Sequence, residues 1–270
     1  EISSDNGRYR LAGENATDFP KIPTVSNATT VDMSTEVLSS AIANTIFATS
    51  SDELRPAMTG VYINLSPTNT TFVATDGHRL AHAAKQLDGE EMLRQEVILP
   101  RKTILELTKL LTDSDDTIDI ELSENQVKFS FSDIVLISKL VDGKFPDFQR
   151  VIPQNQPKKL KLNRLALLGS LNRASILTSD KFRGVRWVLS DGSLKIICSN
   201  TEQEEAQEEL DVDYTGEGLD IGFNVSYLMD VLNNLHDEEI HCDLGDSSSS
   251  ALFTVPGKDD FKYVVMPMRI

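Results

Sequence analysis

The sequence has few cysteines, few basic residues and no long apolar run. Its 270 residues include two cysteines, Cys198 and Cys242, which form no Cys-x-x-Cys pair. This spacing favours two reduced core thiols of a cytoplasmic protein over a disulfide. No stretch approaches the roughly 20 apolar residues of a membrane span, and no signal peptide is recognisable. The sequence therefore predicts a cytoplasmic protein without a membrane partner.

Motifs for catalysis and metal binding are also missing. No Gly-x-Ser-x-Gly elbow supplies a nucleophile for Asp76 and His78, and a triad needs three converging groups. His78 and His82 have the spacing of two metal ligands on a helix, but this stretch alternates like a strand. The acidic run from Glu202 to Asp213 favours a solvated strand and loop over a metal site. We predict no enzymatic activity, no metal and no cofactor.

Basic residues are scarce throughout the chain. The chain has 26 Lys and Arg residues and 42 Asp and Glu residues, so its formal net charge is -16. Acids exceed bases in residues 1–28, 29–157 and 158–270 alike. Such a balance argues against a nucleic-acid partner, because phosphate binding depends on Lys and Arg.

The last ten residues, from Phe261 to Ile270, are unusually apolar for a chain end. Val264 and Val265 predict a strand at the edge of the last sheet, and Pro267 ends it by removing a backbone donor. Residues 266–270 should then leave the sheet as an arm. Such an arm is either a structural clasp or one wall of a binding groove, since Met is common in both settings.

The chain repeats one plan of helix, strands, helix and strands. The helices are predicted at residues 35–49, 100–111, 162–177 and 224–235, and hairpins are predicted within 61–75 and around Ser190–Ser193. A Phe-Pro…Ile-Pro link also recurs, at residues 19–23 and 145–153. We predict domains at 29–157 (repeat A) and 158–270 (repeat B). Residues 1–28, with a hairpin at Asn6-Gly7, should be the remnant of a preceding domain and its linker.

Carboxylates are rare on the four predicted helices. Residues 37–50 contain no charged residue, and Arg173 is the only charged residue in 165–179. The second helix has a net positive charge from Arg101, Lys102 and Lys109. One such helix could simply be buried. Four helices at equivalent repeat positions are better explained by a shared face turned toward a polyanion.

Five motifs, in order along almost the whole chain, resemble those of one family. They are Thr75-Asp76-Gly77-His78-Arg79-Leu80-Ala81, Val141-Asp142-Gly143-Lys144-Phe145-Pro146-Asp147, Lys181-Phe182-Arg183-Gly184-Val185-Arg186, Gly222-Phe223-Asn224-Val225-Ser226-Tyr227 and Tyr263-Val264-Val265-Met266-Pro267-Met268-Arg269. Together they resemble the second and third domains of the bacterial DNA polymerase sliding clamp, the β subunit.

The resemblance implies an α+β fold of repeated DNA-clamp domains, each with two helices packed on antiparallel sheets. Family members form head-to-tail homodimer rings around duplex DNA, with helices lining the hole. Such a ring is attached to DNA topologically. An acidic protein can therefore hold DNA without many contacts to the phosphates. The DNA-facing residues expected on this basis are Arg101 and Lys102, followed by Arg55. The family's aromatic pair beside that arginine is replaced here by Pro56-Ala57.

The resemblance further implies a groove that binds short peptides, commonly of the Gln-Leu-x-Leu-Phe type, from the replicative DNA polymerase, the clamp loader and repair polymerases. The groove residues carried over are Met58, Thr75, Gly77, His78, Arg79, Leu80, Pro146, Arg150, Val151, Asn224, Tyr227, Ser248, Ser250, Val264, Val265, Met266, Pro267, Met268 and Arg269. Met58 stands where the family often has Leu. Ser248, expected under the arm, stands where the family usually has an apolar residue.

The sequence also allows a second function. The chain could be an interaction scaffold built from repeats, with the same peptide groove but without encircling DNA. Retention on circular but not on linear DNA distinguishes the two. The resemblance also implies that one half of the dimer interface belongs to the first domain. We therefore expect the 270 residues alone to be a monomer.

Overall fold

A computed structural model describes residues 2–19, 21, 23–66, 69–86, 94–111, 117–178 and 183–270. Its helices are α1 (Thr35–Ala43), α2 (Arg101–Leu110), α3 (Arg164–Ala174) and α4 (Val225–Asn234), with short 3-10 turns η1 (Ala16–Asp18), η2 (Ile46–Ala48), η3 (Pro56–Met58), η4 (Phe148–Arg150) and η5 (Ser175–Leu177). No helix in this part of the chain is long and apolar enough to cross a bilayer.

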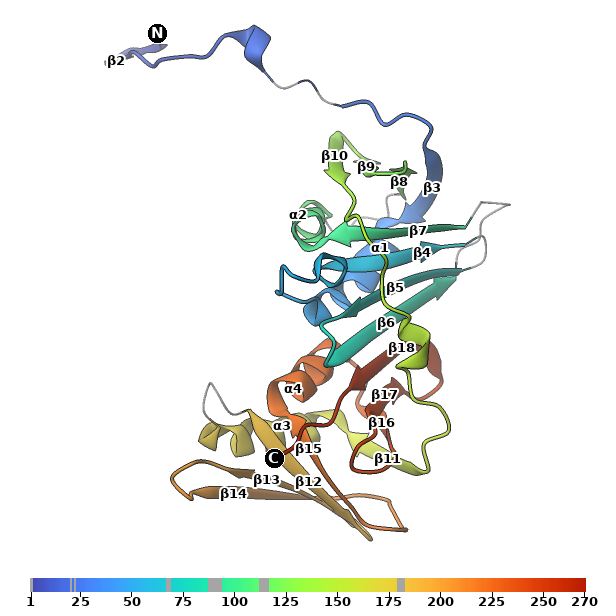
Figure 1. The fold of residues 1–270 in the computed structure, drawn as a ribbon. Helices are drawn as coiled ribbons and strands as arrows, with labels where there is room; N and C mark the ends of the chain where they lie inside the picture. The colour runs from blue at the N-terminus through green and yellow to red at the C-terminus, as the bar shows by residue number, and fades with distance from the viewer. Residues whose placement is uncertain are drawn as a thin grey trace.

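Within the described residues, the strands form four antiparallel sheets (Figure 1). A hairpin pairs β1 (Ile2–Ser4) with β2 (Gly7–Tyr9), as Asn6-Gly7 predicts. Repeat A contains β3 (Thr29–Ser34), β4 (Gly60–Leu65), β5 (Asn69–Thr75), β6 (Arg79–Gln86), β7 (Gln95–Pro100), β8 (Thr117–Leu122), β9 (Gln126–Phe131) and β10 (Ile134–Lys139). Repeat B contains β11 (Lys158–Asn163), β12 (Gly184–Ser190), β13 (Ser193–Ser199), β14 (Glu205–Asp211), β15 (Leu219–Asn224), β16 (Glu239–Leu244), β17 (Ala251–Val255) and β18 (Lys258–Val265).

The largest sheet joins the two repeats. Its eight strands follow the order β11-β16-β17-β18-β6-β5-β4-β7, and β18 pairs with β6 through Val264 and Leu80. The prediction that Tyr263–Val265 is an edge strand is therefore wrong. Tyr263 and Val265 face the main core, whereas Val264 belongs to a second core on the opposite face. A strand that is apolar on both faces is typical of a sheet interior.

Each outer sheet has its counterpart in one half of the central sheet. The order β10-β9-β8-β3 in repeat A corresponds to β18-β17-β16-β11 in repeat B, and β14-β13-β12-β15 in repeat B corresponds to β6-β5-β4-β7 in repeat A. Strand β14 lies within the acidic run from Glu202 to Asp213, and its side chains alternate between exposed and half-buried. The run is therefore a solvated strand, as predicted.

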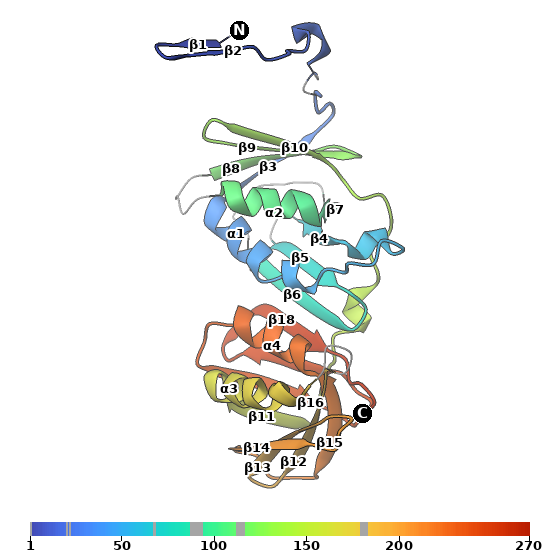
Figure 2. The same ribbon diagram turned by 90° about the vertical axis from the view of Figure 1, so that its left-hand side faces the viewer.

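The helices begin at the predicted residues or up to two residues later, and they end sooner than predicted. Helix α3 begins at Arg164 and not at Leu162, because Leu162 and Asn163 belong to β11. The Ser34 hydroxyl accepts a hydrogen bond from the Val37 amide, and Asn163 and Asn224 cap α3 and α4 in the same way. Helix α1 ends at Ala43 because the Thr45 hydroxyl donates to the Ala41 carbonyl and the chain tightens into η2. All four helices lie on one side of the sheets (Figure 2).

The segment that links the repeats crosses the opposite side of the central sheet. It covers the second core, in which the rings of Tyr62 and Phe145 stack with centroids 5.0 Å apart. Ile152 and Phe148 of the link pack on the same cluster as Val264 and Leu80. The link therefore covers the seam between β6 and β18 on the side away from the helices.

Candidate peptide groove and helical face

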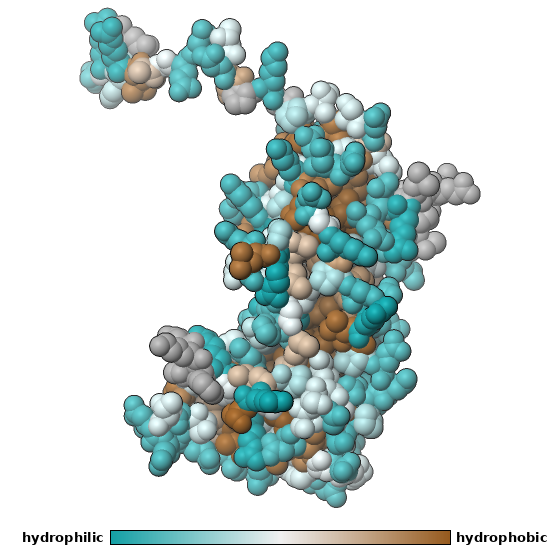
Figure 3. All heavy atoms as spheres, in the orientation of Figure 1, coloured by the Kyte–Doolittle hydropathy of each residue, from teal (hydrophilic) through white to brown (hydrophobic). Residues whose placement is uncertain are grey.

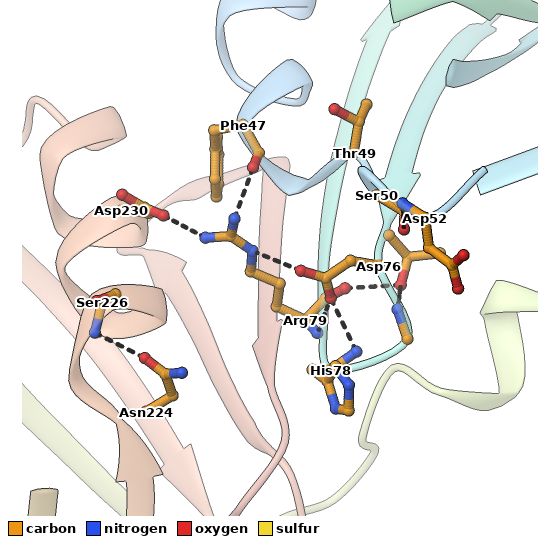
Figure 4. Close-up of polar contacts among 12 residues, drawn as sticks. Phe47, Thr49, Ser50, Asp52, Asp76, His78, Arg79, Asn224, Ser226 and Asp230 are labelled. Atoms are coloured by element: carbon orange, nitrogen blue, oxygen red, sulfur yellow. Dashed lines mark hydrogen bonds and ion pairs between the residues drawn. The ribbon is translucent and has the colours of Figure 1, made fainter. Parts of the chain in front are cut away.

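The turn between β5 and β6 is held rigidly by its own side chains (Figure 4). The Asp76 carboxylate accepts hydrogen bonds from the amides of His78 and Arg79, at 2.9 and 3.0 Å. Gly77 has a φ of 90°, which confirms the prediction that this turn needs an unusual backbone angle. The Thr75 hydroxyl donates to the Arg79 carbonyl and closes the turn. Hydrogen bonds within the turn therefore define the backbone conformation that carries His78.

Arg79 connects this turn to repeat B. Its guanidinium donates to the Asp76 carboxylate at 3.1 Å, to the Phe47 carbonyl at 2.8 Å and to the Asp230 carboxylate of α4. The guanidinium carbon also lies 4.6 Å from the centre of the Tyr227 ring. The side chain is only 11% exposed. Arg79, carried over as a groove residue, is thus occupied by contacts within the protein.

The arm predicted at residues 266–270 lies against both repeats. The Met266 amide donates to the His78 carbonyl at 2.9 Å, so the arm meets the turn between β5 and β6. The Met268 amide then donates to the Gly222 carbonyl of β15 at 2.9 Å. The Ile270 side chain rests on Gly184 of β12. The arm is therefore both a clasp and an exposed apolar surface, since Met266 is 40% exposed.

Gly222 allows the arm to pass close to β15, a role that the sequence reasoning missed. A Cβ at this position would lie 2.5 Å from the Met268 carbonyl oxygen and 2.6 Å from the Ile270 side chain. Glycine inside a strand often marks a close approach of another backbone, and this was the available signal.

Replacement of Gly222 by Ala should displace the arm and weaken peptide binding about tenfold, while the strand and its sheet remain folded. Titration with a Gln-Leu-x-Leu-Phe peptide measures the effect. Gly169→Ala is the matched control, because a Cβ there meets only the flexible end of Arg173. Unchanged affinity of the Gly222 variant would show that the arm's position does not matter.

Several other predicted groove residues surround the same turn. The rings of His78 and Tyr227 stack with centroids 6.3 Å apart, and the Asn224 side chain caps the helix that holds Tyr227. Thr75, Leu80, Val264 and Val265 are buried beneath the surface. Figure 3 shows an apolar patch at the height where β6, β18 and η4 meet in Figure 1. The seam between the repeats therefore presents an apolar surface at this height.

The remaining predicted groove residues lie in short 3-10 turns or outside regular secondary structure. Arg150 is mostly exposed and pairs with Asp147, and Val151 beside it is 39% exposed. Met58 lies in η3, where its carbonyl accepts a hydrogen bond from Ser50. Ser248 lies exposed in the turn before β17, and its hydroxyl donates to Asp246. Its place in the groove, like that of Ser250, Pro267 and Arg269, stays a prediction.

A hollow of about 900 Å³ lies between the link and the strands β4 and β7. Its apolar wall includes Tyr62, Ile98 and Phe145, and Pro146, carried over as a groove residue, also lines it. The sequence reasoning did not predict this hollow, because it depends on how the link crosses the sheet.

The four helices differ from the rest of the chain in net charge. Helices α1 to α4 contain five bases and three acids, a net charge of +2 against -16 for the chain. Two of the acids have cationic partners, since Glu106 pairs with Lys109 and Asp230 with Arg79. Carboxylates on these four helices are therefore few, and two of the three are paired with a cation.

The basic residues predicted to face DNA differ in their surroundings. Arg101 and Lys102 are exposed at the start of α2, and within the described residues neither forms an ion pair with a carboxylate. Arg101 donates to the Thr49 hydroxyl at 3.0 Å. Arg55 pairs with Asp52 at 2.9 Å and lies against Gly77 of the turn. Arg101 and Lys102 are therefore the better placed of the three for a phosphate.

The described residues contain no group of three His, Cys, Asp or Glu side chains that could hold a metal ion. His82 lies on β6 beneath Phe148, where burial and the nearby Lys262 lower its pKa to about 4. His82 is thus a neutral packing residue of the seam. Lys181 and Phe182 of the third motif lie outside the described residues.

Comparisons with known proteins point to a single family. The model of the DNA polymerase III beta subunit central domain matches residues 32–147, and that of its C-terminal domain matches residues 149–269. The beta sliding clamp of Pseudomonas putida is 41% identical over 269 residues, which cover 100% of this chain and 73% of the relative. The beta sliding clamp of Escherichia coli is 37% identical with the same coverage.

Solved structures agree with the sequence matches. The DNA polymerase III subunit beta of Pseudomonas aeruginosa superimposes with a TM-score of 0.91 at 41% identity, over 94% of this chain and 70% of that chain. A second structure of that organism's sliding clamp, bound to griselimycin, has the same TM-score and identity over 94% of this chain and 69% of that one.

Proposed function

The chain belongs to the DNA polymerase III β subunit family of bacterial sliding clamps, and from this we propose how its surfaces act. It is a processivity factor that tethers DNA polymerase to the duplex it encircles, and it is not an enzyme. We assign the DNA-facing surface to the side formed by α1 to α4, with Arg101 and Lys102 as its principal phosphate contacts. The observation that supports this most directly is the common placement of four acid-poor helices on one side of the sheets (Figure 2).

The repeat supports a closed ring. Strand β6 of repeat A pairs with β18 of repeat B. Their counterparts in the other repeat, β14 for β6 and β10 for β18, lie at sheet edges and have no further partner strand there among the described residues. By analogy with the seam, β10 would accept a strand of a preceding domain and β14 a strand of a neighbouring subunit. We therefore propose a head-to-tail homodimer. We place the domains at 1–28, 29–157 and 158–270, where β3 begins at Thr29 and β11 at Lys158.

The seam groove is proposed to bind short peptides of the Gln-Leu-x-Leu-Phe type. Its apolar floor, the stacked rings of His78 and Tyr227 and the exposed Met266 suit the Leu and Phe side chains of such a motif. The partners would be the replicative polymerase, the clamp loader and repair polymerases, which share one groove and therefore compete. We place this activity in the cytoplasm, where bacterial DNA is replicated.

Site-specific photo-cross-linking tests the orientation on DNA. A cross-linker at Leu105, 38% exposed on α2, should label duplex DNA after the full-length protein has been loaded onto a nicked circle. A cross-linker at Lys159, exposed on β11, should label little DNA because it lies on the other side of the sheet. Equal labelling from both positions would contradict the proposal.

A further inference from the structure

Arg79 has contacts that suit an inter-domain tie better than a peptide contact. Its three nitrogens donate to three different elements, namely the β5–β6 turn at Asp76, η2 at Phe47 and α4 at Asp230 (Figure 4). The first two belong to repeat A and the third to repeat B. The side chain is largely buried, so few of its donors remain for a ligand.

Only a guanidinium can make all these contacts at once. Its planar fork directs Nε, Nη1 and Nη2 toward fixed partners, whereas a lysine ammonium is a single point charge. Its flat face also lies over the Tyr227 ring at 4.6 Å, a favourable cation–π arrangement. Arg79 therefore contacts α4 at two residues, through the Asp230 carboxylate and the Tyr227 ring.

Asp230 supplies the repeat B half of this tie. It lies on α4 within one helical turn of Tyr227, and the same helix begins at the cap residue Asn224. Both Tyr227 and Asn224 belong to the proposed groove, but Asp230 does not. A change at Asp230 therefore tests whether the position of α4 matters without removing a groove residue.

We propose that the Arg79–Asp230 ion pair is an inter-domain lock that positions the two walls of the peptide groove. Arg79 is then a positioning residue, and Asp230 is a determinant of peptide affinity although it does not line the groove. This inference rests on the proposed peptide-binding function of the seam.

Asp230→Asn should weaken binding of a Gln-Leu-x-Leu-Phe peptide about tenfold, as measured by calorimetric titration of the full-length protein. Arg79→Lys should weaken it by a similar factor, and the double variant should be little weaker than either single one. Asp230→Glu should retain most of the affinity. Asp237→Asn is the matched control, because it breaks an ion pair with Lys258 that lies within repeat B.

A second readout does not depend on the peptide. Spin labels at Thr108→Cys on α2 and Asn172→Cys on α3 report the distance between the repeats, and the native Cys198 and Cys242 are buried away from the reagent. The distance distribution should broaden in Asp230→Asn and stay narrow in Asp237→Asn.

The possible outcomes distinguish the proposed lock from the proposed peptide-binding function of the groove. Loss of affinity in Arg79→Lys with no change in Asp230→Asn would mean that Arg79 contacts the peptide directly, and the lock would be wrong. A narrow distance distribution in Asp230→Asn would also overturn it. If the wild-type protein binds no peptide but the distribution broadens, the groove function fails and the lock remains.

Discussion

Removal of residues 266–270 is expected to weaken binding of a Gln-Leu-x-Leu-Phe peptide at least about 100-fold. The deletion removes the wall that contains Met266 and Met268, and each buried apolar side chain of this size contributes roughly 1.5–3 kcal/mol. Strand β18 ends at Val265, so its pairing with β6 and β17 remains. The fold should therefore be retained.

Peptide titration and thermal unfolding, measured on the same preparation, check this result. Leu165→Ala, at an exposed position of α3, is the control for loss of an apolar side chain elsewhere. Unchanged affinity in the deletion variant would remove the arm from the groove. A large loss of thermal stability would mean that the arm is mainly a clasp.

Charge reversal of Arg101 and Lys102 to Glu should strongly reduce loading of the protein onto nicked circular DNA. It places two carboxylates on a helical side whose acids are otherwise few, and phosphates would be repelled there. The dependence of loading on salt should also change, because fewer counterions are released. Peptide affinity should be unaffected, since α2 is not part of the groove.

The matched control reverses Lys159 and Lys161 on β11, which changes the net charge of the chain by the same amount. This pair is exposed on the side away from the helices. Equal impairment by both double variants would indicate a general effect of net charge, and the assignment of α2 to the DNA-facing surface would then be wrong.

Local structure was largely predictable from the sequence. The Ser34 cap, the Asn6-Gly7 hairpin and the turn at Gly77 each depend on residues that are close in the chain. Helix ends were less accurate, because Thr45 competes for backbone carbonyls in a way that apolar spacing does not show. The family resemblance, based on five motifs, is confirmed by the comparisons.

Long-range pairing was not predictable. Val264 on β18 pairs with Leu80 on β6, and the apolar end of the chain gave no sign of which strand would cover it. Arg79 and Asp230 are 151 residues apart, so their ion pair depends on how the repeats dock. The passage of the arm over Gly222 likewise depends on tertiary contacts, although the glycine itself was visible in the sequence.

The central claim, that the helical side encloses DNA, is tested most directly by retention on closed and opened circles. The full-length protein is loaded onto a nicked circular plasmid, separated from free protein, and followed before and after a single restriction cut. Topological attachment predicts stable retention on the circle and rapid loss once the DNA is linear. Equal retention on circular and linear DNA would contradict encirclement and favour a scaffold that binds DNA by surface contacts.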